Sequence, residues 1–204
     1  MKRNIGCPCG KTFSVETSEE IDLDMYPEQI ERITDGSFMN FVCPGCGKIH
    51  KPEYPVILSW PSKKATIEFL PELDRGEFYR RKKDPPGAET VIGYPELSDR
   101  ISIIRDGLEP AALESIKYYI LLKAEENYPD AEINIRYQGK GPEAIEFHLH
   151  GIRDDEVAVT RVPLSLYDKT LADFAKHPKG ELFVSLRTRS YLSVQNMLRP
   201  DALK

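Results

Sequence analysis

Four cysteines in two short, similar segments constrain this chain more than any other feature of its sequence. Residues 7–11 read CPCGK, residues 43–48 read CPGCGK, and the chain has no other cysteine. Thiolates held close together on tight turns are typical ligands of a tetrahedral Zn²⁺ ion. In each segment proline presets the turn, and the glycine after the second cysteine permits a positive φ where the chain reverses. The predicted zinc ligands are Cys7, Cys9, Cys43 and Cys46.

Other roles for the cysteines stay open. The second segment contains a C-x-x-C pair, but the βαβ context typical of a redox protein is missing. Two disulfides would suit a secreted protein, whereas inert buried thiols would not be expected to share a repeated motif. His50 follows Cys46 by four residues and could replace a cysteine of the first segment as a ligand. Because four protein ligands leave no open position for water or substrate, we expect a structural zinc site.

Charge limits the classes of partner. The 204 residues include 28 basic and 33 acidic side chains, for a formal net charge of −5. Residues 1–74 hold 8 basic and 12 acidic residues, residues 75–88 hold 5 and 2, and residues 89–204 hold 15 and 19. Both halves are therefore mildly acidic, which argues against nucleic acid as a partner because phosphates require a cationic surface.

The sequence also limits the location of the protein. No apolar run approaches the length of a membrane span. The N-terminus is basic but lacks the apolar stretch of a signal peptide. Together with free thiols, these features predict a cytoplasmic protein.

Hydrophobic patterning predicts an α+β chain of two modules and a linker. Residues 1–74 read as a zinc-ribbon-like β module with a short helix that begins at Pro27. Residues 75–90 are basic and rich in proline and glycine, as in a linker. Residues 91–204 predict an α+β domain with an antiparallel meander and several helices. We expect the basic run at residues 80–83 to be solvated, with contact to phosphates or to an acidic membrane as the alternative.

The C-terminal domain contains the elements on which a partner contact would depend. Strands are expected at residues 133–137, 145–150 and 157–162, and a last strand at residues 182–186. The helix expected at residues 110–128 has an apolar stripe wider than one packing face needs. A stripe of this width means that the helix either contacts a partner or is buried on all sides. Tyrosine is enriched at protein interfaces, which favours contact with a partner. If the helix contacts a partner, changing Tyr118 and Leu122 to charged residues should abolish association and leave the domain folded.

Three polar residues on the middle strand of the meander are a second candidate site. Glu146, His148 and His150 alternate with apolar residues and therefore share one face of the strand. A carboxylate and two imidazoles can belong to a metal triad. Alternation alone, however, also predicts a polar face in contact with solvent, and we expect this strand to hold no metal.

The chain resembles a known family around the second cysteine segment. Residues 35–47 (DGSFMNFVCPGCG) and 54–58 (YPVIL) resemble the bacterial CpXC proteins, which are named for two Cys-Pro-x-Cys motifs. The second segment matches that motif, and the first lacks one residue. The resemblance covers residues 5–72 and continues from Glu96 to Lys117, which follow the pattern ELxxxIxIxxDGLxxxxxExxK. It implies a zinc-binding ribbon and no particular reaction.

These observations predict a non-enzymatic cytoplasmic zinc protein that binds another protein or self-associates. The sequence has no Gly-x-Ser-x-Gly, His-Glu-x-x-His or Walker pattern. One alternative is an enzyme with its site in the C-terminal domain or between the modules, which more than one metal per chain would favour. The other is a nucleic-acid adaptor acting through residues 80–83, which strongly salt-dependent binding would favour.

Overall fold

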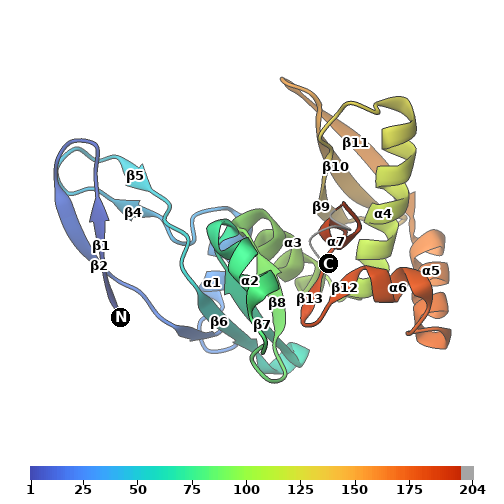
Figure 1. Ribbon diagram of the computed structural model, residues 1–204, viewed down its shortest axis with the longest axis horizontal. Coiled ribbons are helices and arrows are strands. Elements are labelled where there is room, and N and C mark those ends of the chain that lie inside the picture. The colour runs from blue at the N-terminus through green and yellow to red at the C-terminus, as the bar shows by residue number, and fades with distance from the viewer. Residues whose placement is uncertain (199–204) are drawn as a thin grey trace. The chain divides into compact units, whose positions relative to one another are not determined.

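The computed structural model describes residues 1–198 of the chain (Figure 1). The chain divides into two compact units, Met1–Ser98 and Asp99–Lys204. Each unit mixes helices and strands, which confirms the α+β class. The division falls inside helix α3 (Tyr94–Arg105), and not within residues 75–90, where the linker was expected. None of the helices in residues 1–198 combines the length and apolar composition that a membrane span needs.

The first unit begins with two hairpins that carry the cysteines. β1 (Lys2–Gly6) pairs antiparallel with β2 (Thr12–Glu16) on either side of the first cysteine segment. β4 (Phe41–Val42) pairs antiparallel with β5 (Ile49–His50) on either side of the second. The zinc-ribbon-like β module is therefore present, with one pair of cysteines at the turn of each hairpin.

A mixed sheet forms the rest of the first unit. Within this unit its strand order is β8-β7-β6-β3, with β6 and β7 antiparallel and the outer pairs parallel. Alternate residues of β6 are buried, as expected for a strand with one face on a core. The strands of this sheet and the helices between them are, in chain order, β3 (Glu20–Asp22), α1 (Glu28–Thr34), β6 (Val56–Trp60), η1 (Pro61–Lys63), β7 (Ala65–Leu70), η2 (Glu72–Asp74), α2 (Arg75–Arg80) and β8 (Glu89–Ile92).

The segment expected as a linker is packed into this unit. Helix α2 buries Phe78 completely and leaves Arg75 only 7% exposed. The Arg75 guanidinium donates to Glu72 Oε1 at 2.6 Å and to Glu96 Oε1 at 3.2 Å. Composition indicated a solvated segment because two of the carboxylates that neutralise its cations, Glu68 and Glu96, lie outside the segment.

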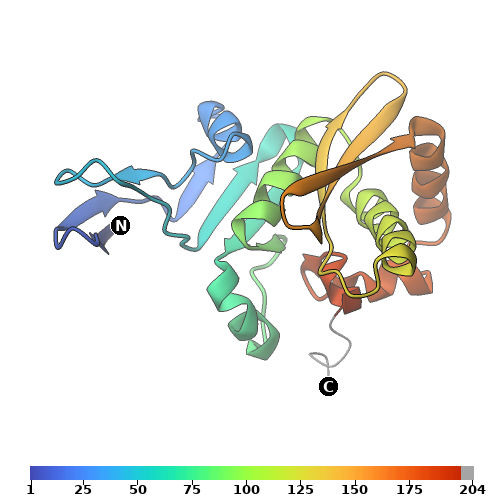
Figure 2. The same ribbon diagram turned by 90° about the horizontal axis from the view of Figure 1, so that it is seen from above.

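The second unit is built on the predicted meander. β9 (Asn134–Lys140), β10 (Ala144–Arg153) and β11 (Glu156–Pro163) form an antiparallel sheet in the order β11-β10-β9. α4 (Pro110–Asn127) lies along one side of this sheet with α5 (Leu164–Lys176) beside it (Figures 1 and 2). The inward residues of the strands and the buried residues of α4 share one core, including Leu113, Ile116, Ile135, Ile145, Phe147 and Leu149.

The C-terminal strand prediction is wrong. Residues 182–186 were expected as a strand, but α6 (Glu181–Ser185) is a helix that buries Phe183. The Phe183 ring lies 5.0 Å from that of Phe174 on α5. A short apolar run cannot distinguish a strand from a buried helical turn, and packing selects the helix. It is followed by β12 (Arg187–Thr188), β13 (Tyr191–Leu192) and α7 (Gln195–Leu198).

Four buried charges tie α3 and α4 to the last segment of the second unit. Lys117 Nζ lies 2.9 Å from Asp99 Oδ2 and 2.8 Å from Glu114 Oε1. The other oxygen of Glu114 accepts a hydrogen bond of 2.8 Å from the amide of Val194. Arg100 Nη2 donates to the carbonyl of Leu192 at 2.9 Å. Each of these charges is compensated by an opposite charge or a backbone partner, as burial requires.

Candidate metal centre

The cysteine pairs sit on turns that differ in length but close in the same way. In the first turn the amide of Gly10 donates to the Cys7 carbonyl, and in the second the amide of Gly47 donates to the Cys43 carbonyl, both at 2.9 Å. Gly10 and Gly47 have φ values of 88° and 75°, which confirms that both glycines occupy positions disfavoured for other residues. The missing residue shortens the first turn without changing how it closes.

The four sulfur atoms converge on one point between the turns. Cys7 Sγ lies 3.5 Å from Cys46 Sγ, and Cys9 Sγ lies 3.7 Å from Cys43 Sγ. All four atoms lie within 4.8 Å of one another. Zn–S bonds of about 2.3 Å in a tetrahedron correspond to sulfur separations of about 3.8 Å. The donor set therefore fits a tetrahedral metal ion, and each turn would contribute two ligands.

Each turn provides one buried and one exposed cysteine. Cys7 and Cys43 are 8% and 1% exposed, whereas Cys9 and Cys46 are exposed to solvent. The amide of Gly45 donates to Cys43 Sγ at 3.4 Å. This hydrogen bond is the largest of the effects that lower the pKa of Cys43 to about 6. The backbone of the second turn thus favours the thiolate form of Cys43, which is the form that binds metal.

The two turns also contact each other through Lys11. A Cβ atom at position 45 would lie 2.8 Å from Lys11 Cδ, so the lysine stem crosses the second turn where glycine leaves room. A cation held near four thiolates reduces the net charge of the site.

His50 does not belong to the sulfur cluster. Its ring packs edge-on against Phe13, with 5.8 Å between ring centroids. The group of side chains that could hold a metal ion contains only the four cysteines. Within residues 1–198 no second group of three or more His, Cys, Asp or Glu side chains has comparable geometry.

The strand residues of the meander lie where the alternation placed them. Glu146 Oε2 accepts one hydrogen bond of 2.8 Å from Arg161 Nε, and its other oxygen lies 3.3 Å from His148 Nε2. The rings of His148 and His150 are 6.5 Å apart between centroids. Arg161 stands opposite Glu146 on the neighbouring strand, so this carboxylate is engaged with a guanidinium. The arrangement is an ion pair with two adjacent imidazoles.

Comparison with known proteins identifies the family. A family described as "CpXC protein" matches residues 5–117, which is more than half of the chain. The chain belongs to the CpXC family. An "Uncharacterized protein" of Treponema pallidum (strain Nichols) is 29% identical to this CpXC protein over 216 residues, covering 94% of this chain and 96% of the relative. No solved structure matches the chain.

The family match and the folded units have different boundaries. The CpXC match continues past Ser98 and ends at Lys117, inside α4 of the second unit. Sequence reasoning did not identify the buried charges within this stretch. A signal was present, because Glu114 and Lys117 stand three residues apart among the apolar positions of a helix.

Proposed function

We propose that this CpXC protein is a non-enzymatic, cytoplasmic zinc protein that acts by binding another protein or a second copy of itself. The observation that carries the metal assignment is the set of sulfur separations, which suit a tetrahedral ion. Four thiolates favour zinc among the common divalent ions, and they leave no position for water or substrate. When bound, the ion would supply folding energy to the hairpins.

Metal analysis of the purified protein tests the zinc assignment. We expect about one zinc per chain. Cys43→Ser should lose the ion and unfold the hairpins while the second unit, which has its own core, stays folded. His50→Gln should keep the ion, because its ring packs on Phe13. Metal-free folded protein with disulfides within the two cysteine pairs would contradict the proposal.

The exposed face of α4 supports the interaction role. Tyr119 is 53% and Leu122 is 39% exposed, three residues apart on one side of the helix. Tyr118 is half-buried against the core of the second unit, so Tyr119 replaces it as the residue to test. The nucleic-acid alternative has less support, because Arg81 in the basic run is bound to Glu68 and Asp84.

Charge reversal on α4 tests the interaction. Tyr119→Glu with Leu122→Glu should abolish self-association, or capture of a partner from the protein's own cells, without lowering the melting temperature. Asn127→Glu adds one of these two negative charges at another exposed position of the helix and should have no effect. Equal association of both variants would rule out this face.

A further inference from the structure

We propose that the second unit binds a linear aliphatic carboxylate in a hollow between α4 and the strands β10 and β11. The hollow has a volume of about 490 Å³, which falls within the range of small-molecule sites. Its lining comes from α4, α5 and the sheet, and all of it lies in the second unit. The proposal goes beyond the proposed function and does not rest on the zinc site.

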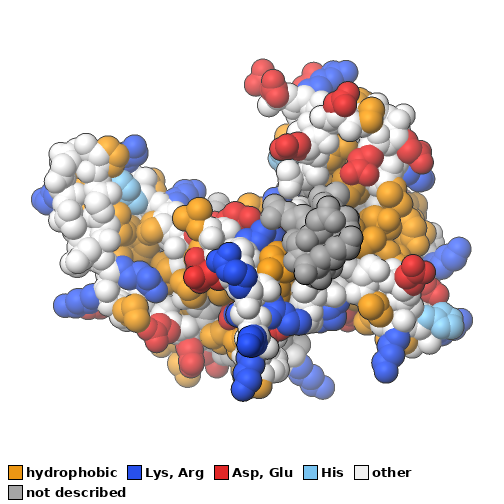
Figure 3. Space-filling model, viewed as in Figure 1, with side chains coloured by type: hydrophobic (Ala, Val, Ile, Leu, Met, Phe, Trp, Pro, Cys, Tyr) orange, Lys and Arg blue, Asp and Glu red, His pale blue; other side chains and the backbone are white. Residues whose placement is uncertain are grey.

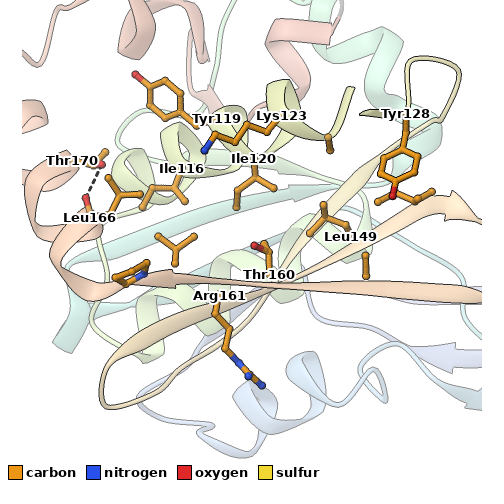
Figure 4. Close-up of a pocket in the computed structure, with 15 residues that line it drawn as sticks. Ile116, Tyr119, Ile120, Lys123, Tyr128, Leu149, Thr160, Arg161, Leu166 and Thr170 are labelled. Atoms are coloured by element: carbon orange, nitrogen blue, oxygen red, sulfur yellow. Dashed lines mark hydrogen bonds between the residues drawn. The ribbon is translucent and has the colours of Figure 1, made fainter. Parts of the chain in front are cut away.

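Small side chains on β11 create the hollow. Ala158 and Thr160 stand opposite Leu149 and Phe147 of β10, so the inner face of the sheet falls away toward its β11 edge. Figure 4 shows Ile116 and Ile120 of α4 on one side of the hollow and Leu149 and Thr160 of the strands on the other. The space between helix and sheet is therefore apolar on both sides.

The hollow opens at a surface where apolar side chains gather. Figure 3 shows hydrophobic side chains exposed over α4. Around the opening, Tyr119, Tyr128 and Leu166 are 53%, 43% and 46% exposed. Covering apolar surface is worth about 25 cal/mol per Å², so an aliphatic chain in the hollow would gain free energy by contact with both walls. Water gains little there, because it needs several polar partners.

Charge around the hollow selects an anionic end group. No acidic residue in the described chain lines the hollow, although the whole protein has a net charge of −5. Arg161 lines it but directs its guanidinium away from α4, toward Glu146 (Figure 4). Lys123 on α4 lines the rim and has no ion pair within residues 1–198. A ligand with an aliphatic chain and a terminal carboxylate would place the chain against the apolar walls and the carboxylate near the ammonium group of Lys123.

Titration of the intact, zinc-loaded protein with dodecanoate, kept below its aggregation concentration, tests the proposal. We expect saturable binding of about one molecule per chain. Dodecylammonium has the same chain and the opposite charge, and it should bind at least tenfold more weakly. Lys123→Gln should weaken dodecanoate binding about tenfold, which corresponds to one charge interaction of about 1.4 kcal/mol. It should strengthen dodecylammonium binding, because it removes a repulsion between two cations, so that the two probes become more nearly equal.

Two neighbouring residues of β11 provide a matched pair of variants. Ala158→Phe fills the hollow and should abolish dodecanoate binding. Val159→Phe places the same ring on the opposite face of the strand, where Val159 is 53% exposed, and should leave binding unchanged. Thr160→Leu narrows the hollow from a second position and replaces Ala158→Phe if that variant fails to fold.

The outcomes separate the proposal from other occupants. Equal binding of the two detergent-like probes, or equal loss in Ala158→Phe and Val159→Phe, would overturn it. A concentration-dependent dimer that Ala158→Phe disrupts and dodecanoate does not would assign the hollow to a second copy of the chain instead.

Discussion

Arg81 binds the carboxylate of Glu68 through two parallel hydrogen bonds of 2.6 Å each. Glu68 is 7% exposed, and Thr90 Oγ1 donates to it at 2.7 Å. Glu68 also raises the pKa of Arg81 through its hydrogen bonds. One member of a basic run that resembled a solvated linker thus joins α2 to the sheet of the first unit.

We predict that Arg81→Gln destabilises the first unit by about 2–3 kcal/mol, because it leaves a buried carboxylate without its charged donor. Denaturant unfolding followed by the fluorescence of Trp60 measures this, since Trp60 is the only tryptophan and is buried in this unit. Lys82→Gln and Lys83→Gln in the same run should change the free energy of unfolding by less than about 0.5 kcal/mol. Equal effects at all three positions would show that only net charge matters.

A second prediction concerns the buried carboxylate of Glu114. Glu114→Gln should destabilise the second unit by about 3–5 kcal/mol, because it removes a negative charge that compensates Lys117 and Arg100. Glu156→Gln breaks the exposed ion pair with Arg153 and should cost less than about 1 kcal/mol. Thermal unfolding of the two variants compares them, and equal melting temperatures would contradict a structural role for the buried charges.

The stabilising interaction of Glu114 with Lys117 and Arg100 should depend on pH. Burial alone would raise the pKa of Glu114, but Lys117 and Arg100 outweigh it and hold the pKa below its usual value. A lowered pKa contributes stability above the unfolded value of about 4.3, and this stability is lost as the pH falls toward the folded pKa. The difference in stability between wild type and Glu114→Gln should therefore be constant at neutral pH and shrink below about pH 4.

Gly151 has no room for a side chain. It lies in β10 with φ of 88°, and a Cβ atom there would meet the backbone oxygen of Glu132 at 2.1 Å. We predict that Gly151→Ala destabilises the second unit by more than about 2 kcal/mol, through strain at this φ and displacement of the neighbouring chain. Gly139 in β9 has nothing within 4 Å of the same position, so Gly139→Ala should be tolerated. Chemical denaturation of both variants checks the difference.

We predict that the histidines of β10 have no role in metal binding. Replacing His148 and His150 together with glutamine should leave zinc content unchanged and alter stability by less than about 0.5 kcal/mol, as partly exposed positions usually do. Mass spectrometry of the native protein and a melting curve provide both readouts. A drop from two metals to one, or a loss beyond about 2 kcal/mol, would instead support the enzyme alternative.

Local patterns predicted those parts of the structure that depend on local chemistry. Spacing and turn residues were enough to predict the cysteine cluster, because each pair is closed by its own short turn. Alternation likewise predicted the face that Glu146 and His148 share. The pairing of Arg81 with Glu68 could not be read this way, since the two residues meet only when α2 packs on the sheet. The strand predicted at residues 182–186 is wrong for a related reason, because the packing of Phe183 favours a helix over a strand in this segment.

The end of the CpXC match inside α4 has a practical consequence for expression work. A recombinant fragment cut at Lys117 would retain only the first part of α4, with the apolar residues Leu113 and Ile116, and lose the strands that cover them. It would also lose Val194 and Leu192, whose backbone groups pair with Glu114 and Arg100. We expect such a fragment to aggregate, which light scattering would detect, whereas the full chain stays dispersed. The family match in this chain thus ends inside a compact unit, and fragments should follow the bounds of the units rather than those of the match.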